Sequence, residues 1–124
     1  PRRRAATAYC AELSFFSCLT GLRYSDVSTL TWGEVHRQGD FTRIVFAQKK
    51  TGGLEYLDIS PQAVMLMGDR AEPQALVFAG LPILTSANYT LSAWSRLAGI
   101  DKHITFHCAR HTFAVMMLDL GVDI

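Results

Sequence analysis

Three basic side chains near the end of the chain have the spacing of neighbours on one helix. His107, Arg110 and His111 stand at positions i, i+3 and i+4, so on a helix their side chains emerge together on one side of two turns. A positive charge in the first turn of a helix is unfavourable beside the positive end of the helix dipole. The placement of Arg110 therefore indicates an anion at this face, although a solvated arginine between two histidines explains the same pattern.

Two further basic residues stand beside predicted turns. Arg23 ends the sequence TGLR (residues 20–23), in which Gly21 stops a predicted helix, and Asp26 follows closely enough to orient its guanidinium. Lys50 lies in QKKTGG (residues 48–53), at the tip of a predicted hairpin. Taken alone, Arg23 is equally typical of a surface arginine paired with Asp26, and lysines beside a glycine turn are common solubilising residues.

A metal site at His107 and His111 is a weaker interpretation. Two histidines at i and i+4 can share one ion, but the residues between them lack the glutamate of a zinc-protease helix. Arg110 would also place a fixed positive charge beside the cation. We therefore expect no metal here.

The elements that must position these residues follow from the periodicity of the apolar side chains. The pattern changes from a helical period to alternation between Glu34 and Ile59, where glycine turns divide three short strands of an antiparallel meander. The fold class is α+β, mainly helical with a small three-stranded antiparallel sheet. The predicted helices are Ala5–Leu19, a short helix with Ser25 as N-cap, Pro61–Met67 with Ser60 as N-cap, Ser86–Ala98, and Phe106–Leu120 with Thr105 as N-cap.

One face of each element should supply the core. In the first helix the apolar positions are Tyr9, Leu13 and Phe16, and in the sheet they are Ile44, Phe46, Leu57 and Ile59. In the last helix they are Phe106, Ala109, Phe113 and Leu120, and Met116 and Met117 should leave apolar surface uncovered.

Composition limits the kind of protein. The 124 residues are 49% hydrophobic and 19% charged, which is typical of one folded domain. Twelve Lys and Arg residues against eleven Asp and Glu give a net charge of +1, which excludes nucleic-acid binding by bulk charge. The 3 cysteines show no CxxC spacing and favour a reducing cytoplasm, and no apolar run is long enough to cross a membrane.

Order and spacing of these motifs make the chain resemble the catalytic domain of tyrosine recombinases, the phage integrase family, and especially integrases of mobile elements. The matching segments are TGLR (20–23) running to LTW (30–32), KTG (50–52) and ITFHCARHTFA (104–114). The resemblance implies a bacterial or phage-encoded protein that acts on double-stranded DNA in the cytoplasm, as a tetramer of recombinase protomers. It implies no metal and no nucleotide cofactor.

The resemblance also implies roles for individual residues. Arg23 and Arg110 would hold the non-bridging oxygens of the scissile phosphate, which gain charge in the transition state. Lys50 would protonate the departing 5′-oxygen, with Lys49 as the alternative if the register slips by one residue. His107 would assist proton transfer. Asp26 and His111 would support the pocket from behind.

The sequence departs from the family pattern at the nucleophile. The family's tyrosine lies some tens of residues beyond the His-x-x-Arg motif, and Tyr9, Tyr24, Tyr56 and Tyr89 all precede it. We therefore expect residues 1–124 to be a partial catalytic domain without the core-binding domain, monomeric and unable to cleave DNA. The alternative is an inert recombinase-like module that binds DNA or a partner. Candidate contacts to the DNA backbone are Arg2, Arg3, Arg4, Arg43, Lys49 and Lys102.

Overall fold

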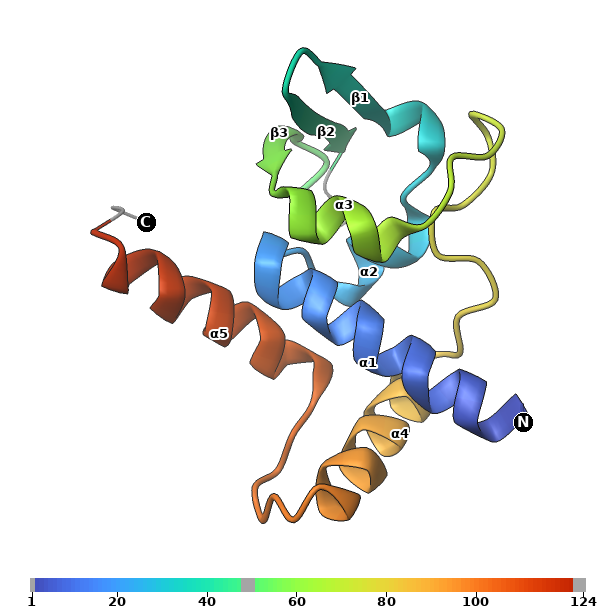
Figure 1. The fold of residues 1–124 in the computed structure, drawn as a ribbon, viewed down its shortest axis with the longest axis vertical. Helices are drawn as coiled ribbons and strands as arrows, with labels where there is room; N and C mark the ends of the chain where they lie inside the picture. The colour runs from blue at the N-terminus through green and yellow to red at the C-terminus, as the bar shows by residue number, and fades with distance from the viewer. Residues whose placement is uncertain (1, 48–50, 122–124) are drawn as a thin grey trace.

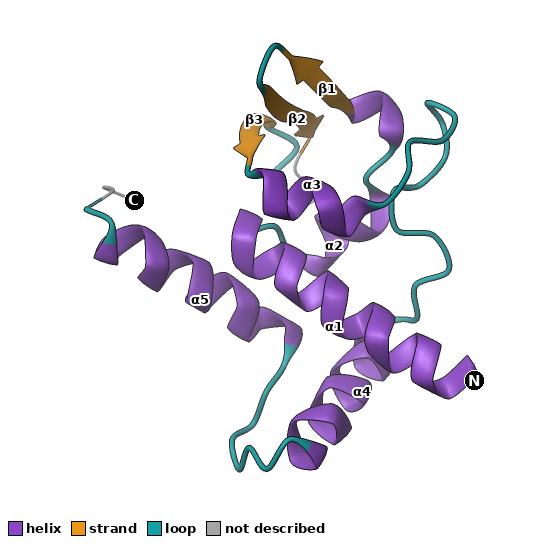
Figure 2. Cartoon of the chain, viewed as in Figure 1, coloured by secondary structure: helices purple, strands orange, loops and turns teal. Residues whose placement is uncertain are grey.

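The structure is a computed structural model that describes residues 2–47 and 51–121, with side chains from residue 9 onward. Lys49 and Lys50 lie outside the described residues, as do the side chains of Arg2, Arg3 and Arg4. The described part contains five α-helices, one short 3-10 helix and three strands, which confirms the predicted α+β class (Figures 1 and 2).

The first helix, α1 (Arg2–Thr20), runs through the middle of the molecule (Figure 1). It contacts α3 (Pro61–Met67), α4 (Leu84–Leu97) and α5 (Phe106–Asp119), so three later elements share one central support. Leu13 and Phe16 are fully buried and Tyr9 is half-buried, which confirms the predicted inner face. Burial of apolar surface around this helix supplies the core.

The sheet is the predicted antiparallel meander. Strands β1 (Val35–Gln38), β2 (Phe41–Ala47) and β3 (Leu54–Ile59) lie in chain order, with Val35 opposite Ile44 and Ile44 opposite Leu57. Ile44, Phe46 and Ile59 are buried, and α3 contacts β2. The buried face of the sheet is therefore the one that the alternation predicts.

Local chemistry sets the start of α3. The side chain of Ser60 accepts a hydrogen bond from the backbone N–H of Ala63 at 3.3 Å, and Pro61 occupies the first helical position. Both residues suit these positions, because the cap satisfies an unpaired donor and proline has none to lose. This helix begins and ends as predicted.

Two predictions about helix ends and faces are wrong. The second helix, α2 (Tyr24–Thr29), has Arg23 rather than Ser25 as its N-cap, because the Arg23 carbonyl already accepts from the N–H of Val27 at 3.0 Å. Leu120 is 72% exposed, because α5 packs against α1 through its earlier turns. Met116 is exposed, as expected, whereas Met117 is half-buried.

Within the described residues, no helix is long and apolar enough to cross a membrane.

Candidate phosphate-binding site

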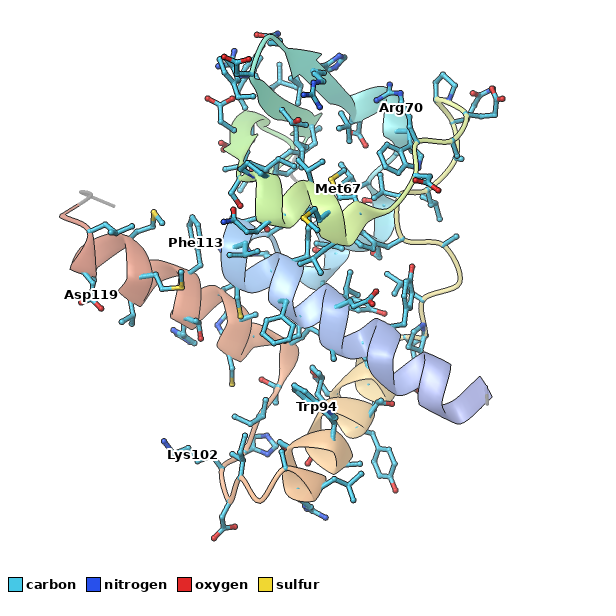
Figure 3. All side chains as sticks on the ribbon, viewed as in Figure 1. Met67, Arg70, Trp94, Lys102, Phe113 and Asp119 are labelled. Carbon is cyan, nitrogen blue, oxygen red and sulfur yellow. The ribbon has the colours of Figure 1, made fainter. Side chains whose placement is uncertain are left out.

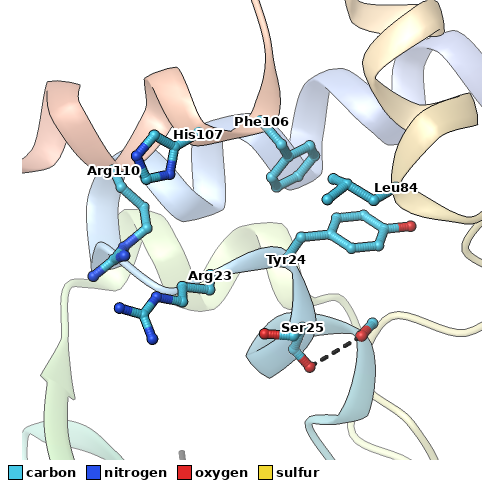
Figure 4. A pocket seen from close by; sticks show the side chains of 8 residues that line it. Arg23, Tyr24, Ser25, Leu84, Phe106, His107 and Arg110 are labelled. Atoms are coloured by element: carbon cyan, nitrogen blue, oxygen red, sulfur yellow. Dashed lines mark hydrogen bonds between the residues drawn. The ribbon is translucent and has the colours of Figure 1, made fainter. Parts of the chain in front are cut away.

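A cavity of about 440 Å³ opens where the N-terminal ends of three helices meet. Arg23 and Tyr24 come from the start of α2, Leu84 from the start of α4, and His107 and Arg110 from the first two turns of α5 (Figure 4). The complete lining is Arg23, Tyr24, Ser25, Ser28, Leu84, Phe106, His107 and Arg110. Two segments far apart in the sequence thus bring both predicted arginines and the predicted histidine into one pocket.

Arg110 is anchored by the turn that carries Arg23. Its Nε donates a hydrogen bond of 2.8 Å to the carbonyl oxygen of Gly21, 89 positions away. Since Nε makes this bond, the two terminal nitrogens at the far end of the guanidinium remain for a ligand in the pocket.

Gly21 also permits the close approach of α5. Its φ of +74° is favourable only for glycine, and a Cβ built on it would lie 2.5 Å from Cδ1 of Phe113. The ring of Phe113 therefore rests directly on the glycine backbone (Figure 3 shows Phe113 on the side of α5 that faces the end of α1). The sequence predicts that Gly21 ends a helix, but it does not indicate that Phe113 packs against this glycine.

Charge in the pocket is predominantly positive. Burial lowers the pKa of Arg110, the nearby charge of Arg23 lowers this pKa further, and the carboxylate of Asp26 opposes both effects. Arginine nevertheless stays protonated in proteins, so the pocket holds two cations that repel each other. Asp26 is buried, and its negative charge offsets part of the positive charge at Arg110. An anion between the two guanidinium groups would relieve the repulsion.

The two histidines of α5 occupy one exposed strip beside the arginine. Their ring centroids are 4.7 Å apart and the rings are nearly perpendicular. His107 lines the main cavity, whereas His111 lines only a neighbouring hollow of about 370 Å³ that Arg110 also borders. The described residues contain no cluster of three or more metal-ligating side chains, so these histidines have no third ligand there.

Of the predicted DNA contacts whose side chains the structure describes, Arg43 and Lys102 do not line the pocket. Arg43, on the exposed face of β2, forms an ion pair with Asp58 through Nε and Oδ1 at 2.7 Å. This pairing lowers the pKa of Asp58, chiefly by the hydrogen bond. Lys102 is exposed on the loop between α4 and α5 (Figure 3). Lys49 and Lys50 follow β2 in the sequence and lie outside the described residues.

Tyr24 lies in the pocket wall, which the sequence did not indicate. Its hydroxyl donates to the carbonyl oxygen of Pro82, and its ring packs edge-on against Phe106 with centroids 5.0 Å apart. Burial raises the pKa of this hydroxyl, and Cys10 adds to the effect. The oxygen therefore points toward the loop before α4 and away from Arg23 (Figure 4).

Comparison with known proteins supports the interpretation from the residues. A model of the phage integrase family matches residues 4–124, whereas a search of curated proteins finds no match. The matched region contains every residue of the pocket. Since the match covers nearly the whole chain, the protein belongs to the phage integrase family, the tyrosine recombinases.

Proposed function

We propose that this domain binds double-stranded DNA by holding one backbone phosphate between Arg23 and Arg110, as part of site-specific recombination. The convergence of these arginines on one pocket carries the proposal. A guanidinium group offers parallel N–H donors that match two phosphate oxygens, so two such groups can surround the non-bridging oxygens. Membership of the family implies site-specific recombination in general.

In the proposed reaction the arginines stabilise the charge that develops on the phosphorus-bound oxygens during in-line attack by a tyrosine hydroxyl. The new bond joins that oxygen to phosphorus, and the bond to the 5′-oxygen breaks. Lys50 supplies the proton to the leaving oxygen, and His107 assists proton transfer at the nucleophile. Asp26 keeps the local charge balanced, and His111 supports the face of α5 from outside the cavity.

We further propose that residues 1–124 bind DNA without cleaving it. The hydroxyls of Tyr9 and Tyr24 donate to the carbonyls of Ala79 and Pro82. Tyr56 and Tyr89 are exposed on β3 and α4, and neither lines the main cavity. The second candidate is an inert recombinase-like module that binds DNA or a partner, and the positions of these hydroxyls fit it equally well, whereas the presence of Arg23, His107 and Arg110 in one pocket favours the recombinase. If a suicide DNA substrate became covalently attached to this chain, that result would contradict both the proposal that residues 1–124 do not cleave DNA and the inert-module alternative.

DNA affinity measured against salt tests the phosphate pocket. Each lost phosphate contact lowers the slope of log K against log salt by about one unit. We expect this loss for Arg23→Ala and for Arg110→Ala in fluorescence anisotropy with a short duplex. The matched control is Arg37→Ala, which removes the same charge from an exposed position on β1, outside the main cavity. Equal slopes for all three variants would refute the proposal.

Lys50 requires a separate test because Lys49 stands beside it. In a form of the protein that also carries the attacking tyrosine, Lys50→Ala should slow cleavage of an intact strand, and a substrate with a better leaving group at the 5′-oxygen should restore the rate. Lys49→Ala should show neither effect. The reverse pattern would assign the proton donor to Lys49.

A further inference from the structure

The first turn of α5 is tied to α4 by one side chain. The backbone N–H of Phe106, the first residue of α5, donates a hydrogen bond of 2.8 Å to Oδ1 of Asn88. The first N–H groups of any helix lack partners inside the helix, so an external acceptor fixes where the helix begins. The helix start also has a local capping box, in which the N–H of Thr105 donates to Sγ of Cys108 at 3.4 Å, but this box pairs the N–H groups of Thr105 and Cys108 and not that of Phe106.

The other half of the pocket is tied to the same region. Tyr24, which directly follows Arg23, donates from its hydroxyl to the carbonyl of Pro82, two residues before α4 begins. The ring of Tyr24 also packs edge-on against Phe106. Residues 82–88 therefore contact the neighbours of Arg23 on one side and of His107 on the other, although they supply only Leu84 to the lining of the cavity.

We propose that Asn88 is a positioning residue for the phosphate pocket, which it sets by fixing the first turn of α5. The inference rests on the proposed function, since it concerns how the phosphate is held. Phe106 directly precedes His107, and Arg110 stands about one turn further along the same helix. Asn88 is half-buried and does not line the cavity, so it acts through α5 and not through contact with DNA. A small displacement of the first turn moves both side chains relative to Arg23, and phosphate binding by two forked groups depends on their alignment.

A double-mutant cycle on DNA binding separates positioning from general stability. We expect Asn88→Ala to weaken duplex binding about threefold to tenfold and to lower the salt slope toward that of Arg110→Ala. In the Arg110→Ala background the same change should have little further effect, because the group that Asn88 positions is gone. Thr90→Ala is the matched control, since Thr90 lies on the same helix and its hydroxyl donates to the carbonyl of Ser86, within α4 itself.

The amide of Phe106 gives a direct signature in nuclear magnetic resonance. Its proton should shift upfield and exchange faster in Asn88→Ala, whereas Asn88→Asp should keep the shift because Oδ1 is retained. Asn88→Gln, which displaces the acceptor by one methylene, replaces Asn88→Ala if that variant does not fold. Unchanged binding, or equal weakening in both backgrounds, overturns the positioning role and leaves the phosphate pocket standing. Unchanged binding of Arg110→Ala itself overturns the proposed function, and the positioning role with it.

Discussion

Replacement of Gly21 by alanine tests how α5 is seated on the turn that carries Arg23. The new Cβ would lie 2.5 Å from Cδ1 and 2.8 Å from Cε1 of Phe113, closer than real Cβ contacts allow. The backbone conformation itself, with φ at +74°, is unfavourable for any residue with a Cβ. Two independent costs therefore fall on one substitution.

The magnitude follows from these two contributions. A left-handed conformation costs a non-glycine residue about 1–2 kcal/mol. Insertion of a methyl group into a packed site costs about 1–3 kcal/mol, because the ring of Phe113 must move. We expect Gly21→Ala to lower the free energy of unfolding by about 2–5 kcal/mol in total, measured by urea denaturation.

The double variant with Phe113→Ala divides the total into its parts. Removal of the ring opens the space for the new Cβ, so the steric part should disappear and only the backbone part of about 1–2 kcal/mol should remain. Phe113→Ala alone provides the reference for the cycle. If the two substitutions were additive, or if Gly21→Ala were neutral, the packing of α5 on Gly21 described above would be wrong.

Three further predictions concern single side chains. Ser60→Ala should lower the free energy of unfolding by about 1 kcal/mol in urea denaturation, because the N–H of Ala63 loses its acceptor, and Ser60→Asp should restore it. Arg43→Ala should raise the pKa of Asp58 toward its ordinary value in a carboxyl ¹³C titration. The sign follows from the lowered pKa in the folded state: the pair favours folding at neutral pH, and this contribution is lost as the pH falls through the folded pKa. An identical titration in both proteins would contradict the pairing. Arg110→Lys should keep most of the salt slope, because the charge is retained, but it should weaken duplex binding severalfold in fluorescence anisotropy. The reason is that lysine lacks both the forked donors and the Nε–H that bonds to Gly21. An unchanged affinity would contradict phosphate binding by forked donors.

Features set by local chemistry could be predicted from the sequence. The cap at Ser60, the meander with its glycine turns and the inner face of α1 all depend on residues close together in the chain, and all three are confirmed. The short helix α2 is present as predicted, but its N-cap is Arg23 and not Ser25, because the sequence leaves both residues possible as the residue before the first turn. The hydrogen bond from the N–H of Val27 to the carbonyl of Arg23 makes Arg23 the N-cap, and the sequence does not show that this bond forms.

Features set by packing could not be predicted. Leu120 continues the apolar period of α5, but the period does not show that α5 leaves the body of the protein before reaching it. The contacts of Asn88 with Phe106 and of Gly21 with Phe113 depend on the angles between helices, which no local pattern encodes. The resemblance to the family predicted that Arg23 and Arg110 act together. It did not predict that Tyr24, Leu84 and Phe106 line the same cavity, which only the structure shows.

The most direct test of the phosphate pocket is to follow the arginine Nε–H resonances during titration with a short DNA duplex. The Nε–H signals of Arg23 and Arg110 should shift together and give one common Kd, since both groups face the same cavity. The signal of Arg37, which is exposed on β1, should stay in place. Shifts that appear at Arg37 but not at Arg23 and Arg110 would contradict the account.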